Sequence, residues 1–144
     1  MRRCVFLLAA VLLVGCGGVS RVGYVAMNEA LAASLPVFPG AAKTHELSSP
    51  YVTTEGGLST RPVGYRTTVV YRVPRGTAGA SVLRFYSAQL GRRGWRTHRD
   101  TPPVGRFTRG RALAVVNTIF LTRVQRRLGE RVYELVVDSR GGRS

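Results

Sequence analysis

The chain has 144 residues, with 22 lysines and arginines against 7 aspartates and glutamates, and a formal net charge of +15. Its length suits one folded domain with one hydrophobic core, and its two cysteines, Cys4 and Cys16, both lie near the N-terminus, so no disulfide framework is expected. The charge alone identifies no partner, because a surplus of arginine spread over the surface explains it as well as a dedicated patch does.

The N-terminus carries the most informative pattern. Arg2 and Arg3 precede an apolar run of about 7–15 residues, the length of a signal-peptide core and short of the roughly 20 residues that span a bilayer. Residues Leu13-Val14-Gly15-Cys16 resemble a bacterial lipobox. The resemblance implies cleavage between Gly15 and Cys16, and a diacylglycerol and an N-acyl chain on Cys16 as the only attached groups. An uncleaved anchor, or an ordinary signal peptide in which Cys16 is incidental, is the alternative.

This interpretation divides the chain into four parts. Residues 1–15 are predicted to be a lipoprotein signal peptide, 16–23 a lipidated tether, 24–138 a single α+β domain and 139–144 a basic disordered tail. The domain is then expected in the bacterial cell envelope, held by its lipid on the extracytoplasmic side of the cytoplasmic membrane or at an outer membrane.

Three elements are predicted in the first half of the domain. Residues 24–35 are rich in alanine and place Met27, Leu31 and Leu35 four residues apart, which predicts a short helix. A strand is predicted at 42–47. Residues 48–64 mix serine, threonine, glycine and proline without a period, so a mobile hairpin loop is expected there.

The clearest strand and a second helix follow. Residues 65–73 alternate, so one face of the predicted strand carries Tyr65, Thr67, Val69, Tyr71 and Val73. Residues 78–93 carry apolar side chains at helical spacing. Thr77 is expected to cap the start of this helix, and Gly94 to end it in the left-handed conformation.

The remaining chain is predicted to be β-structure. Strands are expected at 95–99, 111–123 and 131–138, with a turn at 102–105. One face of the long second strand would carry Leu113, Val115, Ile119 and Leu121. Strands that flank a single central helix, without a βαβ rhythm, favour an α+β fold: an antiparallel β-sheet with helices packed on one face, in two layers.

Residues 36–138 also resemble a pattern seen in small uncharacterised bacterial lipoproteins. The resemblance is carried by Pro39-Gly40-Ala41, an alternating strand, Phe85-Tyr86 with Leu90, and Gly94-Trp95. It implies a small α+β body behind a lipidated cysteine, and it brings no catalytic residues with it. The aromatic residues are interpreted as structural: Phe85, Tyr86 and Leu90 form the buried helix face, and Trp95 is a core or rim residue.

The sequence shows no catalytic or metal-binding pattern. His45 and His98 have no second ligand at metal-site spacing, and the chain lacks both a Gly-x-Ser-x-Gly elbow and a phosphate-binding glycine loop. His98-Arg99-Asp100 is interpreted as an exposed strand end, and Glu130 and Glu134 as ion-pair partners of arginines. A non-enzymatic protein is therefore predicted.

Two arginine clusters are the candidate anion-binding residues: Arg92, Arg93 and Arg96, and Arg126 and Arg127. They form no complete nucleic-acid motif, and in an envelope protein the anions within reach are lipid headgroups and acidic polymers, so nucleic acid is not expected as a partner. The predicted function is binding to, or supporting the assembly of, another envelope component, with an envelope protein or an anionic polymer as the candidate partners. The alternative is a basic module that adheres to anionic lipid or polymer, with affinity that falls steeply with salt.

Overall fold

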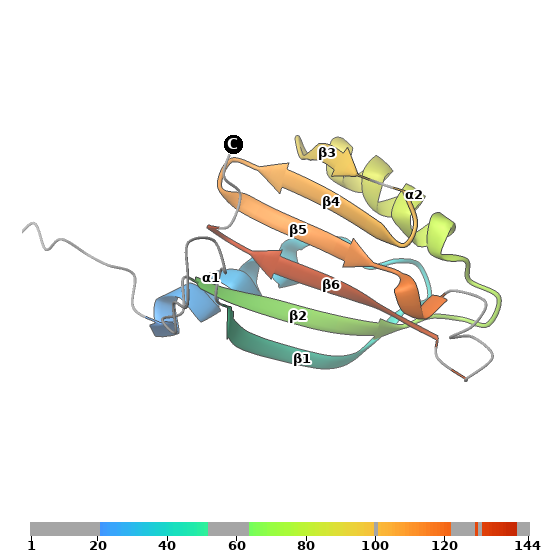
Figure 1. The fold of residues 1–144 in the computed structure, drawn as a ribbon, viewed down its shortest axis with the longest axis horizontal. Helices are drawn as coiled ribbons and strands as arrows, with labels where there is room; N and C mark the ends of the chain where they lie inside the picture. The colour runs from blue at the N-terminus through green and yellow to red at the C-terminus, as the bar shows by residue number, and fades with distance from the viewer. Residues whose placement is uncertain (1–20, 52–63, 100, 122–128, 130, 141–144) are drawn as a thin grey trace, which may run out of the picture.

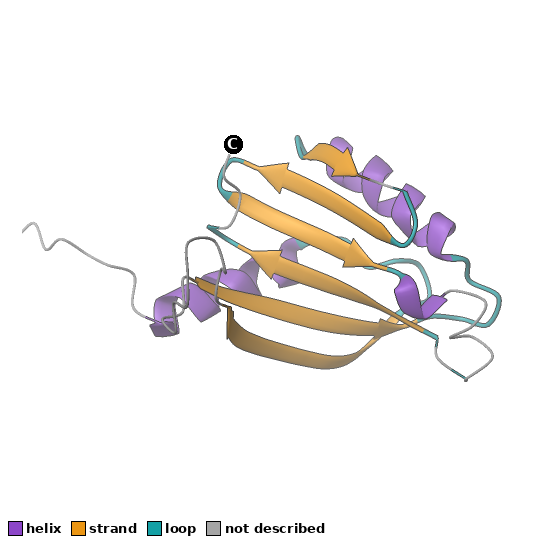
Figure 2. Ribbon diagram, viewed as in Figure 1, coloured by secondary structure: helices purple, strands orange, loops and turns teal. Residues whose placement is uncertain are grey.

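The computed structural model describes residues 21–51, 64–99, 101–121, 129 and 131–140. It shows an open six-stranded antiparallel sheet with two α-helices on one face, so the predicted α+β fold is confirmed (Figure 1). Figure 2 shows the two layers by colour, with the helices behind the strands. The elements in chain order are α1 (Arg21–Ser34), β1 (Ala42–Tyr51), β2 (Gly64–Arg72), α2 (Gly79–Gly91), β3 (Arg96–Arg99), β4 (Val104–Arg109), β5 (Ala112–Asn117), a 3₁₀ turn η1 (Ile119–Leu121) and β6 (Val132–Asp138).

The sheet has the strand order β1-β2-β6-β5-β4-β3, with every neighbouring pair antiparallel. The last strand of the chain, β6, therefore lies in the centre and joins the β1–β2 hairpin to the β3–β5 meander. Val137 of β6 pairs with Thr67 of β2 on one side and with Ala114 of β5 on the other. The sheet is complete only when the C-terminal strand has been inserted.

The hydrophobic core lies between the helices and one face of this sheet. The predicted face of the 65–73 strand is buried as expected at Thr67, Val69, Tyr71 and Val73, while Tyr65 is half-buried. The predicted helix face is confirmed at Tyr86 and Leu90, with Phe85 partly buried beside them, and Trp95 is a core residue. The largest fully buried side chains are Tyr86, Tyr133, Phe107, Leu83, Leu90 and Leu135.

Three tyrosines form an aromatic column inside this core. The rings of Tyr71 and Tyr133 stack with centroids 5.1 Å apart, and the hydroxyls of Tyr86 and Tyr133 are hydrogen-bonded at 3.0 Å. Burial raises the pKa of Tyr133 to about 12 and raises the pKa of Tyr86 further. Both hydroxyls therefore stay protonated in the folded protein at physiological pH.

Helix α1 begins earlier than predicted, and its predicted apolar stripe is confirmed at Leu31 and Leu35 but not at Met27. Residues 21–23 are helical, not part of a tether, and Met27 is 44% exposed, so the predicted stripe is wrong at that position. Asn28 is fully buried instead: its Nδ2 donates to the Tyr65 carbonyl (2.8 Å), and its Oδ1 accepts from the Ser139 amide (2.8 Å). The side-chain amide supplies the donor and the acceptor that the ends of β2 and β6 need, which apolar periodicity cannot indicate.

The predicted tail also begins later than expected. Besides the bond from Ser139 to Asn28, the Arg140 amide donates to Asp138 Oδ1 at 2.9 Å, so residues 139 and 140 belong to the fold. Residues 1–20 and 141–144 lie outside the described residues, and with them the predicted signal peptide and lipidation site.

Strand β1 extends into the segment predicted to be a loop. Residues 48–51 continue the pairing with β2, and the Ser48 and Thr67 hydroxyls are hydrogen-bonded at 2.6 Å. Pro50 is compatible with this because β1 is an edge strand, where a missing amide donor breaks no ladder. Residues 52–63 lie outside the described residues.

The predictions for 102–105 and 111–123 are wrong in extent. Residues 104–109 form β4, and a turn at Gly110, which has φ of +56°, leads into β5. β5 ends at Asn117 because the Thr118 amide donates to the Pro103 carbonyl (2.7 Å), and the η1 turn follows. The predicted shared face is broken: Leu121 is in the core, Ile119 is 44% exposed, and Leu113 and Val115 point to the opposite side of the sheet from the helices.

One end of helix α2 differs from the prediction and the other confirms it. The N-cap is Ala78, without a side-chain cap, and the Thr77 hydroxyl instead donates to the Pro74 carbonyl at 2.9 Å. At the other end Gly94 has φ of +77°, and the Trp95 amide donates to the Leu90 carbonyl at 3.1 Å. Gly94 thus ends the helix as expected.

Candidate functional site

One face of the sheet lies on the side away from both helices, and we call it the open face. Helix α1 packs on β2 and β6, and α2 on β3 and β4, all from the same side (Figure 1). Period-two alternation places mostly β-branched side chains on the open face, where they are half-buried: Val70 of β2, Val104 of β4, Val115 of β5, and Val132 and Val136 of β6. This face is apolar without being part of the core.

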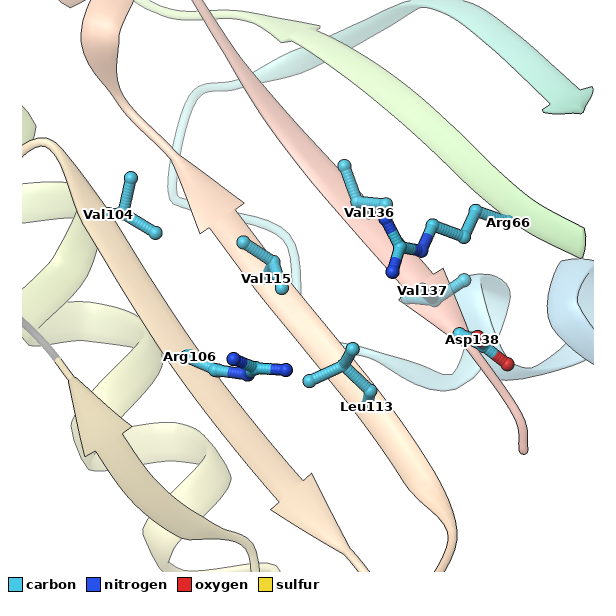
Figure 3. Close-up of a pocket in the computed structure, with 8 residues that line it drawn as sticks. All are labelled: Arg66, Val104, Arg106, Leu113, Val115, Val136, Val137 and Asp138. Atoms are coloured by element: carbon cyan, nitrogen blue, oxygen red, sulfur yellow. The ribbon is translucent and has the colours of Figure 1, made fainter. Parts of the chain in front are cut away.

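A cavity of about 370 Å³ lies on the open face (Figure 3). The residues that line it come from the four central strands: Arg66, Val104, Arg106, Leu113, Val115, Val136, Val137 and Asp138. Leu113 is only 4% exposed although it is not part of the core cluster. The cavity therefore has an apolar floor between two cationic side chains.

The two arginines reach over this floor from opposite sides. Figure 3 shows the Arg66 side chain extending from β2 over β6, and that of Arg106 extending from β4 over β5, toward each other. The floor between them is set by register, since Val115 pairs with Val136, and Arg106 pairs with Val115. Two guanidinium groups on either side of an apolar floor offer hydrogen-bond donors and positive charge to an anion.

Asp138 lies at the edge of the cavity and connects it to α1. Its side chain is fully buried, and its Oδ1 accepts hydrogen bonds from the Tyr24 hydroxyl (2.5 Å) and the Arg140 amide (2.9 Å). Its register partner on β5 is Leu113. A buried carboxylate with these donors fixes the end of β6 and hence the wall of the cavity.

The chemistry of the lining favours binding. The side chains are arginine, valine, leucine and one aspartate, so they offer bidentate anion donors and an apolar surface. A nucleophile beside a general base is not among them. The arrangement suits a carboxylate, phosphate or sulfate that is attached to an apolar group.

The arginines predicted from sequence lie elsewhere. Arg92 and Arg93 follow α2 and Arg96 begins β3, so these three are brought together beside the end of α2 and do not line the cavity. Arg93 Nη1 donates to the Ser34 carbonyl at 2.8 Å and so links the ends of the two helices. Arg126 and Arg127 lie outside the described residues.

The arginines that do line the cavity were not predicted from the sequence, because their proximity depends on how the strands pair. Alternation in 65–73 already places Arg66 on the side away from the core. Nothing in the sequence indicates that β6 and β5 separate β2 from β4, and only that order brings Arg66 and Arg106 over one floor.

The other polar candidates are engaged in local contacts. His98 Nε2 and Thr108 Oγ1 are 2.6 Å apart across β3 and β4, and Asn117 Nδ2 donates to Glu134 Oε2 at 2.9 Å. Asp100 and Glu130 lie outside the described residues. Within the described ranges, no three His, Cys, Asp or Glu side chains are grouped so that they could hold a metal ion. In the same ranges no helix has the length and apolarity to cross a bilayer.

No protein-family model, curated protein or solved structure matches this chain. The likeness to small lipoproteins therefore stays a prediction, and residue roles are drawn from the geometry alone.

Proposed function

We propose that this protein is a lipid-anchored envelope protein whose domain binds, without catalysis, an anionic and partly apolar group of another envelope component on the open face. The observation that carries the proposal is the pair of arginines, Arg66 and Arg106, above a floor of Val115 and Val136. The anchor is the acylated Cys16 that the lipobox pattern predicts.

Three features support binding over a purely structural role for this face. The floor is apolar yet lies outside the core cluster, and large apolar surface of this kind is typical of interaction sites. The cationic residues sit at its margin, where they add specificity for an anion. Leu47, on the edge strand β1, is 56% exposed and extends the apolar surface, since its partner Thr68 pairs with Val136.

A photoreactive amino acid at position 115 tests the proposal in native envelopes. We expect a crosslinked adduct that disappears when Arg106→Glu is combined with the probe, because the reversed charge repels the anion. Arg84→Glu is the matched control, since Arg84 is exposed on α2, in the other layer. A probe at Ala88, also exposed on α2, should give no such adduct.

The comparison between these variants decides the outcome. Binding at the open face would be contradicted by equal labelling from positions 115 and 88. It would also be contradicted by an adduct that survives Arg106→Glu. Circular dichroism of each variant checks that the fold is retained.

A further inference from the structure

Two arginines and two tyrosines form a cluster at the end of the molecule where α1 begins, and we call it the tether-end cluster. The Arg21 guanidinium lies over the Tyr65 ring at 5.7 Å, and that of Arg140 lies over the Tyr24 ring at 5.6 Å. The two rings contact each other with centroids 5.9 Å apart. Two contacting rings, each covered by a cation, thus bring the start of α1, the start of β2 and the end of β6 into one surface.

The cluster is joined to the rest of the fold by hydrogen bonds. The Tyr24 hydroxyl donates to Asp138 Oδ1, and the Arg140 amide donates to the same oxygen. Asn28, one helical turn further along α1, fastens the helix to β2 and β6. The arginines are exposed at the surface while the tyrosines beneath them are half-buried.

The predicted anchor is close to this cluster along the chain. Arg21 is five positions after Cys16, and even a fully extended segment over those five steps spans at most about 18 Å. The start of α1 therefore stays within that distance of an acylated Cys16. The other arginine group is remote, since Arg93 contacts Ser34 at the far end of α1, and a helix of 14 residues is about 21 Å long.

The charge around the cluster is positive. The first turn of α1 contains no acidic residue, so Arg21 adds to the positive end of the helix dipole where a carboxylate would offset it. Asp138, the carboxylate that the described part of this surface contains, is buried beneath the tyrosine. Val22, beside Arg21, is 78% exposed. Arginine, tyrosine and an exposed apolar side chain are the composition of surfaces that contact the headgroup layer.

We propose that the tether-end cluster lies against the anionic headgroups of the membrane that holds Cys16, and that this contact restricts how the domain is oriented on the bilayer. The proposal rests on the lipid anchor of the proposed function. The partner is the bilayer surface itself, because the tether holds the cluster near the bilayer and the cluster is positively charged.

Acylated protein purified from its own host and placed in vesicles provides the test. The mature chain has no thiol besides acylated Cys16, so a fluorophore on Val22→Cys labels one position. Headgroup-bound nitroxide lipids should quench this probe more strongly in phosphatidylglycerol-containing vesicles than in pure phosphatidylcholine. A probe on Gly91→Cys is the control, because that position is exposed at the end of α2 and a side chain there meets nothing within 4 Å.

Neutralising Arg21 and Arg140 measures how much their charges contribute to the contact with the membrane. Each basic residue near an anionic surface strengthens binding by about 5-fold, so Arg21→Gln with Arg140→Gln should lower the ratio of docked to undocked domain by about 30-fold. Arg75→Gln with Arg84→Gln removes the same charge from other exposed positions and should leave quenching unchanged.

Two readouts separate the anchor from the cluster. Flotation with vesicles in high salt reports the anchor: protein that dissociates contradicts the anchor and the proposal that rests on it. If the protein floats, two results contradict the cluster alone. One is a position-22 probe that is quenched no more than the position-91 probe, and the other is quenching at position 22 that the two Gln substitutions leave unchanged.

Discussion

The buried hydroxyl pair of Tyr86 and Tyr133 is a single-residue feature with a measurable energy. The two oxygens are 3.0 Å apart, and the Phe38 amide also donates to the Tyr133 hydroxyl, at 3.4 Å. Tyr133→Phe removes the acceptor of the part-buried Phe38 amide and the partner of the buried Tyr86 hydroxyl. We expect a loss of about 1–3 kcal/mol in the free energy of unfolding. Urea denaturation measures it, and Tyr86→Phe combined with Tyr133→Phe should cost less than the two single changes added together.

The same pair predicts how stability depends on pH. The folded-state pKa of Tyr133 is raised to about 12 and that of Tyr86 is raised more, from an unfolded value of about 10. Below about pH 10 both states keep the proton and the contribution is constant. Above it the unfolded state loses protons that the folded state retains, so the free energy of unfolding falls as the pH rises toward 12. Urea titrations across this range should give a shallower fall for the double Phe variant, and equal slopes would contradict the prediction.

Asn28 also has a measurable effect on stability, because its side chain hydrogen-bonds α1 to the ends of both β2 and β6. Asn28→Ala leaves the Tyr65 carbonyl and the Ser139 amide without this partner in a buried place. We expect a loss of more than about 2 kcal/mol in the free energy of unfolding. Glu29→Ala, the next and exposed position of the helix, is the control and should change stability little. Chemical denaturation of both variants provides the comparison.

At the scale of elements, the end of α2 offers a matched pair of glycines. A Cβ at either Gly91 or Gly94 meets nothing within 4 Å, so packing is equal at the two positions, but only Gly94 has a positive φ, +77°. Gly94→Ala should lower the free energy of unfolding by about 1–2 kcal/mol, because L-residues resist the left-handed conformation. Gly91→Ala lies within the helix and should leave stability unchanged or raise it by up to about 1 kcal/mol. Thermal melts of both variants provide the comparison. Equal changes in stability would contradict a helix stop that is set by the backbone conformation of Gly94.

Elements with a strong local signal were predictable, and those defined by a partner were not. The alternating 65–73 strand and the helix before Gly94 have their period and their stop in adjacent residues, and both are confirmed. β4 was missed because Val104 to Arg109 follows two prolines and carries a glycine at a core-facing position, so its alternation is weak. β5 was drawn too long because the Thr118 amide turns to Pro103, a contact between distant residues.

At the scale of the whole molecule, the fold class followed from the order of the elements and the candidate site did not. Cross-strand neighbours on the open face come from β2, β6, β5 and β4, so the site exists only once the last strand has paired between hairpins formed earlier in the chain. In the sequence, runs of adjacent arginines were the pattern that predicted anion binding. Arg66 and Arg106 are single residues in alternating strands, and pairing, not spacing, brings them over one cavity.

The anchor can be tested on the whole chain by two cysteine substitutions. The lipobox interpretation requires the thiol of Cys16 but not that of Cys4, although both cysteines flank the same apolar run. Cys16→Ser should abolish acylation, because a hydroxyl cannot form the thioether, and the protein should be recovered without lipid-dependent membrane binding. Cys4→Ser changes only the predicted leader and should be processed normally. Intact-mass spectrometry of both variants and of the wild-type chain, each purified from the native host, gives the readout: the wild type and Cys4→Ser should begin at Cys16 and carry acyl mass. Acylated, membrane-bound Cys16→Ser protein would contradict Cys16 as the site of acylation, and with it the proposed orientation of the domain, which depends on a tether at that residue.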